Sequence, residues 1–310
     1  MIKTLIALSR PDHWFKNLMM LPGYVIAAFI FDLPLFASLS TLGIAFAATC
    51  LMASANYVLN DWLDARFDQF HPVKRHRPLM TQQVGATIIY LEYGFLVVAG
   101  FGLGLLVSKA FAVVLSLLWM QGILYNVRPL RTKERVYIDV ISEAVNNPIR
   151  LFLGWFVILP NPWPPSSLII SYWMGGAFLM AVKRFAEFRF INDPSVAALY
   201  RRSFAYYTED RLLISAFFYG ACSALFFGVF MVKYRIELVF SLPLLAWMFT
   251  WYLYIGMKPD SPAQRPESLY RESGFMLYVL LVAVFVTVML FIDIPWVHQL
   301  SENAFTFDRP

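Results

Sequence analysis

Residues 37–68 read ASLSTLGIAFAATCLMASANYVLNDWLDARFD, an apolar run that ends in clustered acidic side chains. The stretch 37–60 is long enough to cross a hydrocarbon core of about 30 Å, because a helix rises about 1.5 Å per residue. Eight further apolar stretches lie at 17–36, 84–107, 109–126, 138–159, 166–190, 211–232, 237–257 and 273–293. The sequence therefore predicts an all-α integral membrane protein with about nine transmembrane helices.

The composition excludes a water-soluble globular protein. Of the 310 residues, 59% are hydrophobic and 15% are charged, and the mean hydropathy is +0.60. One enclosed core cannot hide that much apolar surface. The two cysteines, Cys50 and Cys222, both fall inside apolar stretches, which excludes a disulfide framework and a cysteine-based zinc site.

Basic residues are distributed unequally between the two sides of the predicted bundle. Twenty lysines and arginines lie in the N-terminal segment or around the connections after even-numbered spans, and four lie on the other side: Lys109, Lys233, Arg235 and Arg309. The positive-inside rule then predicts a multi-pass protein of the cell (inner) membrane with a cytosolic N-terminus and an external C-terminus. Residues 1–16 lack the apolar core of a signal peptide and are expected to lie along the membrane surface. We expect a single transmembrane domain over residues 1–310.

The acidic cluster at the end of 37–68 has the pattern of a metal site. Asp61, Asp64 and Asp68 are three, four and seven residues apart, so they share one face of a helix. Carboxylates at a helix C-terminus repel one another and oppose the helix dipole, so a bound cation is expected. With the amide of Asn60 they offer the oxygen ligands that Mg²⁺ prefers, and phosphate oxygens often complete its shell. The alternative is a solvated helix end whose acids pair with Lys74 or Arg75.

The motif Asn60-Asp61-x-x-Asp64-x-x-x-Asp68, followed by the basic loop His71-Pro-Val-Lys74-Arg75-His76-Arg77-Pro78, resembles the first aspartate-rich motif of the UbiA superfamily of intramembrane prenyltransferases. The resemblance implies nine transmembrane helices around a central cavity that opens to the cytosol and laterally to the bilayer. It also implies that Asn60, Asp61, Asp64 and Asp68 hold Mg²⁺ and a diphosphate leaving group, with the three aspartates as catalytic residues.

Residues 181–189 lie where that superfamily carries a second aspartate-rich motif, and here they read AVKRFAEFR. Lys183 and Arg184 make this wall mainly cationic; Lys183 and Glu187 are spaced to pair, and Arg184 is expected to point elsewhere on the helix. A basic wall that faces a metal-loaded acidic wall favours a ligand with anionic groups at more than one end. Phosphoribosyl pyrophosphate and a lipid phosphate are such ligands. The alternative is a positive-inside anchor whose cations meet lipid headgroups.

Four segments together resemble the polyprenyl-phosphate phosphoribosyltransferase branch of that superfamily: residues 10–17, residues 60–78, Ile138-Asp139 with Arg150, and residues 183–187. Two features depart from that branch, namely Phe185 in place of an expected tyrosine and Asn146-Asn147-Pro148 within the fifth span. The expected substrate-binding residues are Lys16, Asn17, Asn60, Lys74, Arg75, Arg77, Tyr125, Arg128, Asp139, Arg150, Lys183, Arg184 and Glu187. For Tyr125 and Arg128, interfacial anchoring is an equal alternative.

Arg150 lies inside the predicted fifth span, about 18 Å along a helix that begins near Ile138. An intramembrane arginine costs about 2.5 to 3.5 kcal/mol on insertion scales, so its side chain should face a polar cavity. The preceding Asn146, Asn147 and Pro148 predict a locally opened helix that lines this cavity. Arg150 is expected to bind phosphate, and the alternative is a structural pair with Glu143 or another acid.

Together these residues favour Mg²⁺-dependent transfer of a 5-phosphoribosyl group from phosphoribosyl pyrophosphate to a polyprenyl phosphate, such as decaprenyl phosphate, with release of diphosphate. A lipid phosphate is already ionised near neutral pH, so a catalytic triad is not needed. A second hypothesis is prenyl transfer from a diphosphate to an aromatic or other lipid precursor, which requires the second acidic wall. A third is a transporter or an anion-binding membrane protein without chemistry, which has no need of three clustered aspartates. The expected partners are the membrane lipid and phosphoribosyl pyrophosphate, without nucleic acid.

Overall fold

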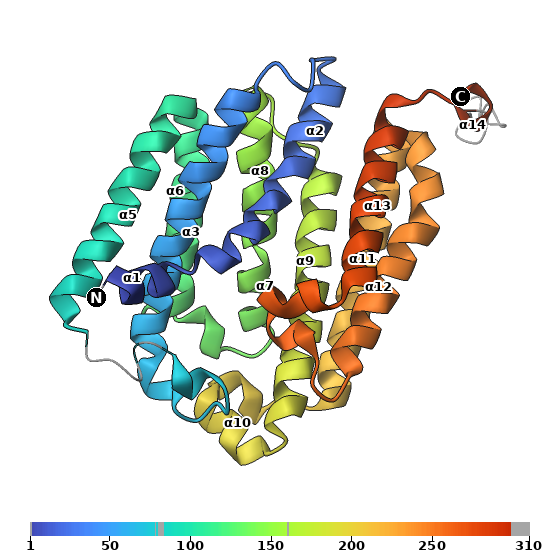
Figure 1. The fold of residues 1–310 in the computed structure, drawn as a ribbon. Coiled ribbons are helices and arrows are strands. Elements are labelled where there is room, and N and C mark those ends of the chain that lie inside the picture. The colour runs from blue at the N-terminus through green and yellow to red at the C-terminus, as the bar shows by residue number, and fades with distance from the viewer. Residues whose placement is uncertain (1, 78, 80–83, 160, 299–310) are drawn as a thin grey trace, which may run out of the picture.

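The computed structural model describes residues 2–77, 79, 84–159 and 161–298, which form a bundle of upright helices (Figure 1). Within these residues, seven segments are long and apolar enough to cross a membrane. They are α3 (Leu39–Asp68), α5 (Ala86–Val107), α6 (Lys109–Asn126), α9 (Ser166–Ile191), α11 (Glu209–Tyr234), η5 (Ile236–Ser241) with α12 (Leu242–Met257), and α13 (Ser273–Phe291). Each corresponds to a predicted span, and α3 continues through the acidic motif as its spacing required. The all-α prediction is confirmed.

The first and fifth predicted spans are not single long helices. In place of 17–36 the chain forms the 3-10 helix η1 (Pro11–Met20) and then α2 (Leu21–Ile30). In place of 138–159 it forms α7 (Ile138–Ala144) and α8 (Asn146–Ile158), which are separated at Val145. Proline fits the first turn of a helix because the N–H groups there have no intrahelical partner, which explains why α8 begins just before Pro148. The number of nine crossings therefore stays a prediction.

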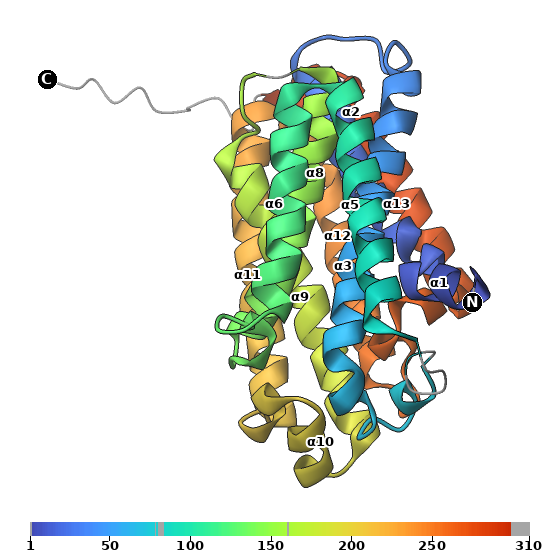
Figure 2. The same cartoon turned by 90° about the vertical axis from the view of Figure 1, so that its left-hand side faces the viewer.

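The connections after α3, α6, α9 and α12 gather at one end of the bundle, together with α10 (Pro194–Tyr200), as Figures 1 and 2 show. The short helix α14 (Pro295–His298) lies at the opposite end, and α1 (Ile2–Ser9) lies across the bundle. The basic connections thus share one end, as the charge count predicted, whereas the side of the membrane that it faces stays a prediction. Pro78 and Arg309 lie outside the described residues.

Two glycines allow α2 and η1 to cross α8 at very short distance. A Cβ atom on Gly23 would lie 2.0 Å from the carbonyl oxygen of Leu151, and one on Gly154 would lie 1.8 Å from that of Met20. Any larger residue would force the helices apart. This crossing brings the N-terminal segment and α8 together, and with them two predicted site residues, Asn17 and Arg150.

Candidate active site

The acidic end of α3 is surrounded by cations from other segments. Arg10 donates hydrogen bonds to both carboxylate oxygens of Asp61, at 2.6 to 3.0 Å. One nitrogen of Arg77 lies 3.2 Å from Asp61 and 2.6 Å from Asp68, so it bridges the two carboxylates. These two carboxylates raise the pKa of Arg77, against the lowering effect of burial. The repulsion expected at this helix end is therefore relieved by side-chain cations.

Asp64 is neutralised by the connection between α6 and α7. Lys133, in the 3-10 helix η3 (Thr132–Glu134), lies 2.5 Å from Asp64 and also contacts the side-chain oxygens of Asn60 and Asn126 at 3.3 and 2.7 Å. Arg131 donates to the same Asp64 oxygen at 2.8 Å. Burial lowers the pKa of Lys133 to about 8, although the charge of Asp64 opposes this shift. Asp64 thus binds two cations at once.

The donor types at this helix end suit a hard divalent cation such as Mg²⁺, but within the described residues the three carboxylates do not lie within 4.8 Å of one another, because Asp64 pairs with Lys133 and Arg131. Three carboxylates and one amide lie on the last turns of one helix, and oxygen donors of this kind are the ligands of Mg²⁺. The Arg77 nitrogen already lies between Asp61 and Asp68, so a positive charge is accommodated between them. Among the described residues, none of these acids forms an ion pair with Lys74 or Arg75. The alternative, a solvated helix end whose acids pair with those two residues, is therefore wrong.

The α9 wall is not mainly cationic, which corrects the expectation from residues 181–189. Arg184 is 1% exposed and contacts three acids: Asp139 at 3.3 Å, Glu187 at 3.4 Å, and Glu143. Lys183 pairs with Glu143 at 3.1 Å rather than with Glu187, and Arg184 does not point away from Glu187 as expected. The reason is that α7 packs beside α9 and contributes Asp139 and Glu143, which the local sequence of α9 does not contain.

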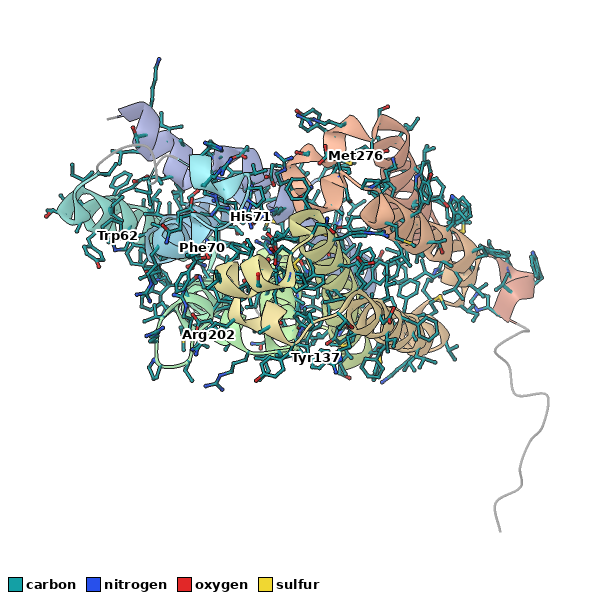
Figure 3. The ribbon with its side chains drawn as sticks, turned by 90° about the horizontal axis from the view of Figure 1, so that it is seen from below. Trp62, Phe70, His71, Tyr137, Arg202 and Met276 are labelled. Atoms are coloured by element: carbon teal, nitrogen blue, oxygen red, sulfur yellow. The ribbon has the colours of Figure 1, made fainter. Side chains whose placement is uncertain are left out.

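The basic loop after α3 connects the two walls. Lys74 bonds to the Glu187 carboxylate and to the hydroxyl of Tyr200, and the His71 ring lies 3.6 Å from Glu187. Burial lowers the pKa of Lys74, and the charge of Glu187 raises it. Seen from below, His71 lies near the middle of this end of the bundle (Figure 3). The predicted residues Lys74, Arg77 and Glu187 are therefore brought to one end with the acids of α3.

Arg150 has no acidic partner among the described residues. Its side chain is 7% exposed, and it donates to the Asn17 side-chain oxygen at 2.8 Å and to the Asn146 carbonyl at 3.3 Å. The alternative of a pair with Glu143 is wrong, because Glu143 is occupied by Lys183, Arg184 and the Tyr125 hydroxyl. Within the part of the chain that the structure describes, the buried charge of Arg150 is thus hydrogen-bonded to neutral groups.

Lys16 is a second cation near this position without a carboxylate within 4.0 Å among the described residues. Its ammonium group lies 2.9 Å from Nδ1 of His13, and the other ring nitrogen of His13 lies 3.2 Å from Glu267. An ammonium group only donates, so His13 accepts at Nδ1 and carries its proton at Nε2, toward Glu267. Burial lowers the pKa of Lys16 to about 8. Within the described part of the chain, Lys16, Asn17 and Arg150 therefore form a cationic site with no carboxylate at ion-pair distance, although Glu267 and Glu143 attract its charges from farther away.

Several predicted site residues do not lie as expected, and several residues of the site were not predicted from the sequence. Arg75 is exposed and its side chain contacts His76, Arg128 is exposed, and Asp139 is enclosed by protein groups. Tyr125 belongs to the Arg184 network through its hydroxyl rather than to a lipid interface. The missed residues are Arg10, His71, Arg131, Lys133, Glu143, Tyr200 and Arg201. Arg131, Lys133 and Arg201 were counted in the sequence as charges that set the topology, whereas Arg10 and His71 lie in segments that carried the family resemblance without a role of their own.

Removing one hydrogen bond to Asp139 should destabilise the protein. Asp139 is 0% exposed and accepts from the hydroxyls of Tyr207 at 2.6 Å and Ser203 at 3.1 Å. Tyr207→Phe is expected to lower the free energy of unfolding by about 1 to 3 kcal/mol, because the carboxylate loses a buried donor. Thermal unfolding in detergent measures this loss. Tyr206→Phe, at an exposed neighbour, is the control, and equal stability of the two variants would contradict the role of Asp139 as an anchor.

Comparisons with known proteins identify the family of this chain. Residues 19–281 match the UbiA prenyltransferase family. The chain is 27% identical over 216 residues to the decaprenyl-phosphate phosphoribosyltransferase of Mycolicibacterium smegmatis, covering 68% of this chain and 65% of that protein. It is 33% identical over 228 residues to the protein of the same name from Corynebacterium glutamicum, covering 68% of this chain and 61% of that protein. The chain thus spans less than two thirds of the length of these relatives.

A solved structure has the same fold. A UbiA homolog from Archaeoglobus fulgidus bound to GPP and Mg2+ superposes with a TM-score of 0.70 and 17% sequence identity, over 93% of this chain and 100% of that chain. The sequence match, the shared fold and the seven apolar helices lead to one conclusion. This multi-pass membrane protein belongs to the UbiA prenyltransferase family.

Proposed function

We propose that the protein transfers a 5-phosphoribosyl group from phosphoribosyl pyrophosphate to a polyprenyl phosphate such as decaprenyl phosphate and releases diphosphate. The observation that carries this proposal is the buried guanidinium of Arg150, which has no carboxylate within 4.0 Å among the described residues. A buried charge without a counter-charge is costly, so a ligand anion is expected to complete the site. The acids of α3 supply a separate position for a metal-bound diphosphate. Two phosphate-bearing substrates require two such positions.

The residues that would hold Mg²⁺ are Asn60, Asp61, Asp64 and Asp68. When bound there, the ion neutralises negative charge on the diphosphate leaving group. The cations that pair with these acids have a second role, because Arg77, Arg131 and Lys133 lie within hydrogen-bond distance of the same carboxylates. In the proposed reaction they would donate to the outer diphosphate oxygens once the ion holds the carboxylates, as guanidinium and ammonium groups do for phosphates.

Lys16, Asn17 and Arg150 would orient the phosphate of the lipid acceptor. An oxygen of that phosphate attacks the anomeric carbon as the carbon–oxygen bond to diphosphate breaks. The attacking oxygen is already ionised near neutral pH, so these residues contribute position and charge rather than proton transfer. The lipid tail would leave the site between helices toward the bilayer, which explains why the enzyme is embedded in the membrane.

The α9 side of the site contributes differently from the sequence-based expectation. Arg184 is held by Asp139, Glu143 and Glu187, and we assign it a positioning role. Lys183 is partly exposed and pairs with Glu143 alone, so it is the α9 cation best placed to meet a phosphate. Lys74 and Glu187 fix the loop after α3 against α9.

The comparisons support this proposal in two ways. The relatives from Mycolicibacterium smegmatis and Corynebacterium glutamicum are named decaprenyl-phosphate phosphoribosyltransferases. The solved homolog is bound to GPP and Mg2+, which supports a metal and a diphosphate in this fold. We assign the acidic end of α3 to the cytosolic side, because the basic connections lie at that end.

A second candidate function is prenyl transfer from a prenyl diphosphate to an aromatic acceptor, which the GPP-bound homolog favours. One experiment separates the two. Purified protein with Mg²⁺ receives either radiolabelled phosphoribosyl pyrophosphate with decaprenyl phosphate, or radiolabelled prenyl diphosphate with 4-hydroxybenzoate. We expect label in the phosphoribosylated lipid. Label only in the prenylated aromatic would establish the second function, and no label in either product would exclude both.

A further inference from the structure

A basic hollow lies beside the acidic end of α3. It has a volume of about 650 Å³ and is formed by the connection 127–137 together with α10 and the 3-10 helix η4 (Arg202–Ala205). Its charged lining consists of Arg128, Arg131, Arg135, Arg202 and Glu134, which leaves a net charge of +3. We call these five residues with their hollow the arginine hollow. Its volume is in the range of small-molecule sites, which is about 300 to 1,000 Å³.

Most of this positive charge is not used to hold the fold together. The side chains of Arg128 and Arg135 are exposed and have no hydrogen bond or ion pair within the described part of the chain. Arg202 is 72% exposed and reaches only Glu134, at 3.6 Å. Arginines that serve only as membrane anchors do not need to line one concave surface. These guanidinium groups are therefore available to an anionic ligand.

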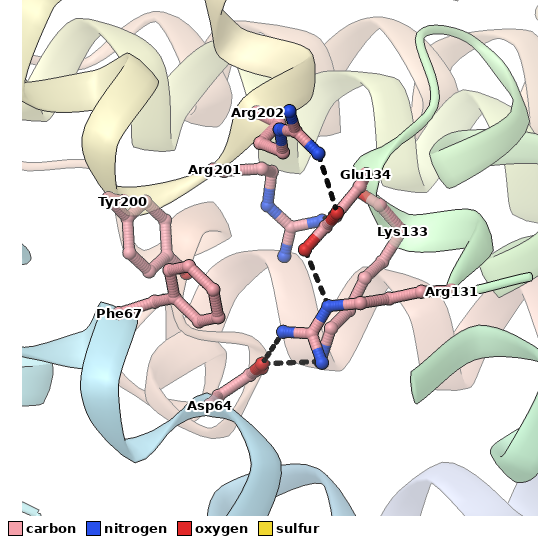
Figure 4. Close-up of a pocket in the computed structure, with 8 residues that line it drawn as sticks. All are labelled: Asp64, Phe67, Arg131, Lys133, Glu134, Tyr200, Arg201 and Arg202. Carbon is pink, nitrogen blue, oxygen red and sulfur yellow. Dashed lines mark hydrogen bonds and ion pairs between the residues drawn. The ribbon is translucent and has the colours of Figure 1, made fainter. Parts of the chain in front are cut away.

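A series of ion pairs connects the arginine hollow to the proposed metal site. Figure 4 shows these pairs: Asp64 with Arg131 at 2.8 Å, Arg131 with Glu134 at 2.6 Å, and Glu134 with Arg202 at 3.6 Å. Arg131, Glu134 and Arg202 line both the hollow and the small pocket next to Asp64. The two spaces are thus adjacent and share a wall. Glu134 is the one carboxylate in this shared wall. It pairs with the guanidinium groups of Arg131 and Arg202, which an arriving anion would meet.

We propose that the arginine hollow is the entrance by which the soluble diphosphate substrate reaches the acids of α3, and that this substrate displaces Glu134 from Arg131 and Arg202. The inference rests on the proposed function, in which the donor is a water-soluble diphosphate. A charged concave surface concentrates ions of opposite sign and raises association rates by about 10 to 10³-fold at low ionic strength. Pro129, Leu130, Ala198, Ala205 and Tyr206 also line the hollow, but its net charge of +3 favours a multiply charged anion over an uncharged polyprenyl tail. The soluble substrate is therefore its occupant.

The first test removes the two unpaired arginines. The Arg128→Gln/Arg135→Gln double variant is expected to raise the KM for phosphoribosyl pyrophosphate about tenfold at low salt and to leave kcat unchanged. The difference should disappear at about 0.5 M salt, because exposed charges are then screened. Arg189→Gln is the control for loss of an exposed arginine outside the hollow, where Arg189 lies 3.6 Å from Glu209 and donates to the Met257 carbonyl at 3.0 Å.

The second test predicts a gain, which damage to the fold does not produce. Glu134→Gln removes the competing carboxylate and is expected to lower the KM for phosphoribosyl pyrophosphate several-fold at low salt. Glu209→Gln, the partner of Arg189 at the same 3.6 Å separation, is the control and should have no effect. An unchanged or raised KM in Glu134→Gln would contradict the displacement of Glu134.

A binding measurement keeps this inference separate from the proposed function. Radiolabelled inorganic pyrophosphate is the leaving group of either candidate reaction, so its association with protein in nanodiscs can be followed whichever donor is used. Slower association in the double variant would support the entrance, even if phosphoribosyl pyrophosphate proved not to be the donor. Equal association rates would overturn it. A rise in the KM for decaprenyl phosphate alone would overturn it as well, because the hollow would then bind a lipid headgroup.

Discussion

Asp64→Asn is expected to reduce Mg²⁺-dependent turnover about 10³-fold, the scale of losing one charged group that stabilises a developing negative charge. Asparagine keeps the shape of the side chain but removes the carboxylate of the proposed metal site. The fold should survive the change, because Lys133 still contacts the side-chain oxygens of Asn60 and Asn126, and Arg131 still pairs with Glu134. Turnover measured over a Mg²⁺ titration, together with binding of Mn²⁺ as a paramagnetic probe, tests both parts of this expectation.

A matched control for this variant is Asp210→Asn, which changes an exposed aspartate in the first turn of α11. It should retain full turnover and the binding of Mn²⁺. If Asp64→Asn also retained full activity, the assignment of Asp64 to the metal site would be wrong. A loss of turnover with unchanged Mn²⁺ binding would instead assign Asp64 to holding Lys133 and Arg131 in place.

Arg150→Met is expected to change substrate binding and stability in opposite directions. It should raise the KM for the polyprenyl phosphate about 30-fold or more, which corresponds to losing about 2 kcal/mol from a buried charge pair with the ligand. The protein without ligand should be as stable as the wild type or more stable, because the variant removes a buried cation that has no counter-charge. The KM values of both substrates and thermal unfolding without ligand measure the two effects.

Arg184→Met provides the comparison, since Arg184 is also buried but lies among Asp139, Glu143 and Glu187. Removing it leaves acids without their partner and should lower the free energy of unfolding by about 3 to 5 kcal/mol. A variant at Arg150 that is destabilised to the same degree, with unchanged KM for both substrates, would show that Arg150 is structural. Comparison of the two variants thus distinguishes a buried arginine that binds the ligand from a buried arginine that stabilises the fold.

The acidic motif is the part of the site that the sequence predicted best. Asp61, Asp64 and Asp68 lie on the last turns of α3 as their spacing required, and α3 continues through them. Helical periodicity is a property of neighbouring residues, so it can be read without the fold. Arg10 and Lys133, which also meet these acids, were not predicted, because Arg10 is 51 residues from Asp61 and Lys133 is 69 residues from Asp64.

The prediction for α9 failed for the same physical reason. The segment 181–189 contains three basic residues and one acid, so it was interpreted as a cationic wall. In the structure, Asp139 and Glu143 of α7 lie against Arg184 and change the charge of that wall. Conversely, Arg150 lacks the acidic partner that was the alternative for it, which strengthens the prediction that it binds phosphate.

The amino-acid sequence by itself determined that the chain is a helical membrane protein with an acidic motif at one helix end. The length of an apolar run and the periodicity of a helix depend on neighbouring residues alone. In a membrane these two quantities determine that the chain forms spanning helices. The tertiary structure alone decided which charges neutralise one another, which cations have no ion pair among the described residues, and where the arginine hollow lies. A buried charge is stabilised by whichever group lies within a few ångströms, and that neighbour is set by the crossing of helices distant in the chain.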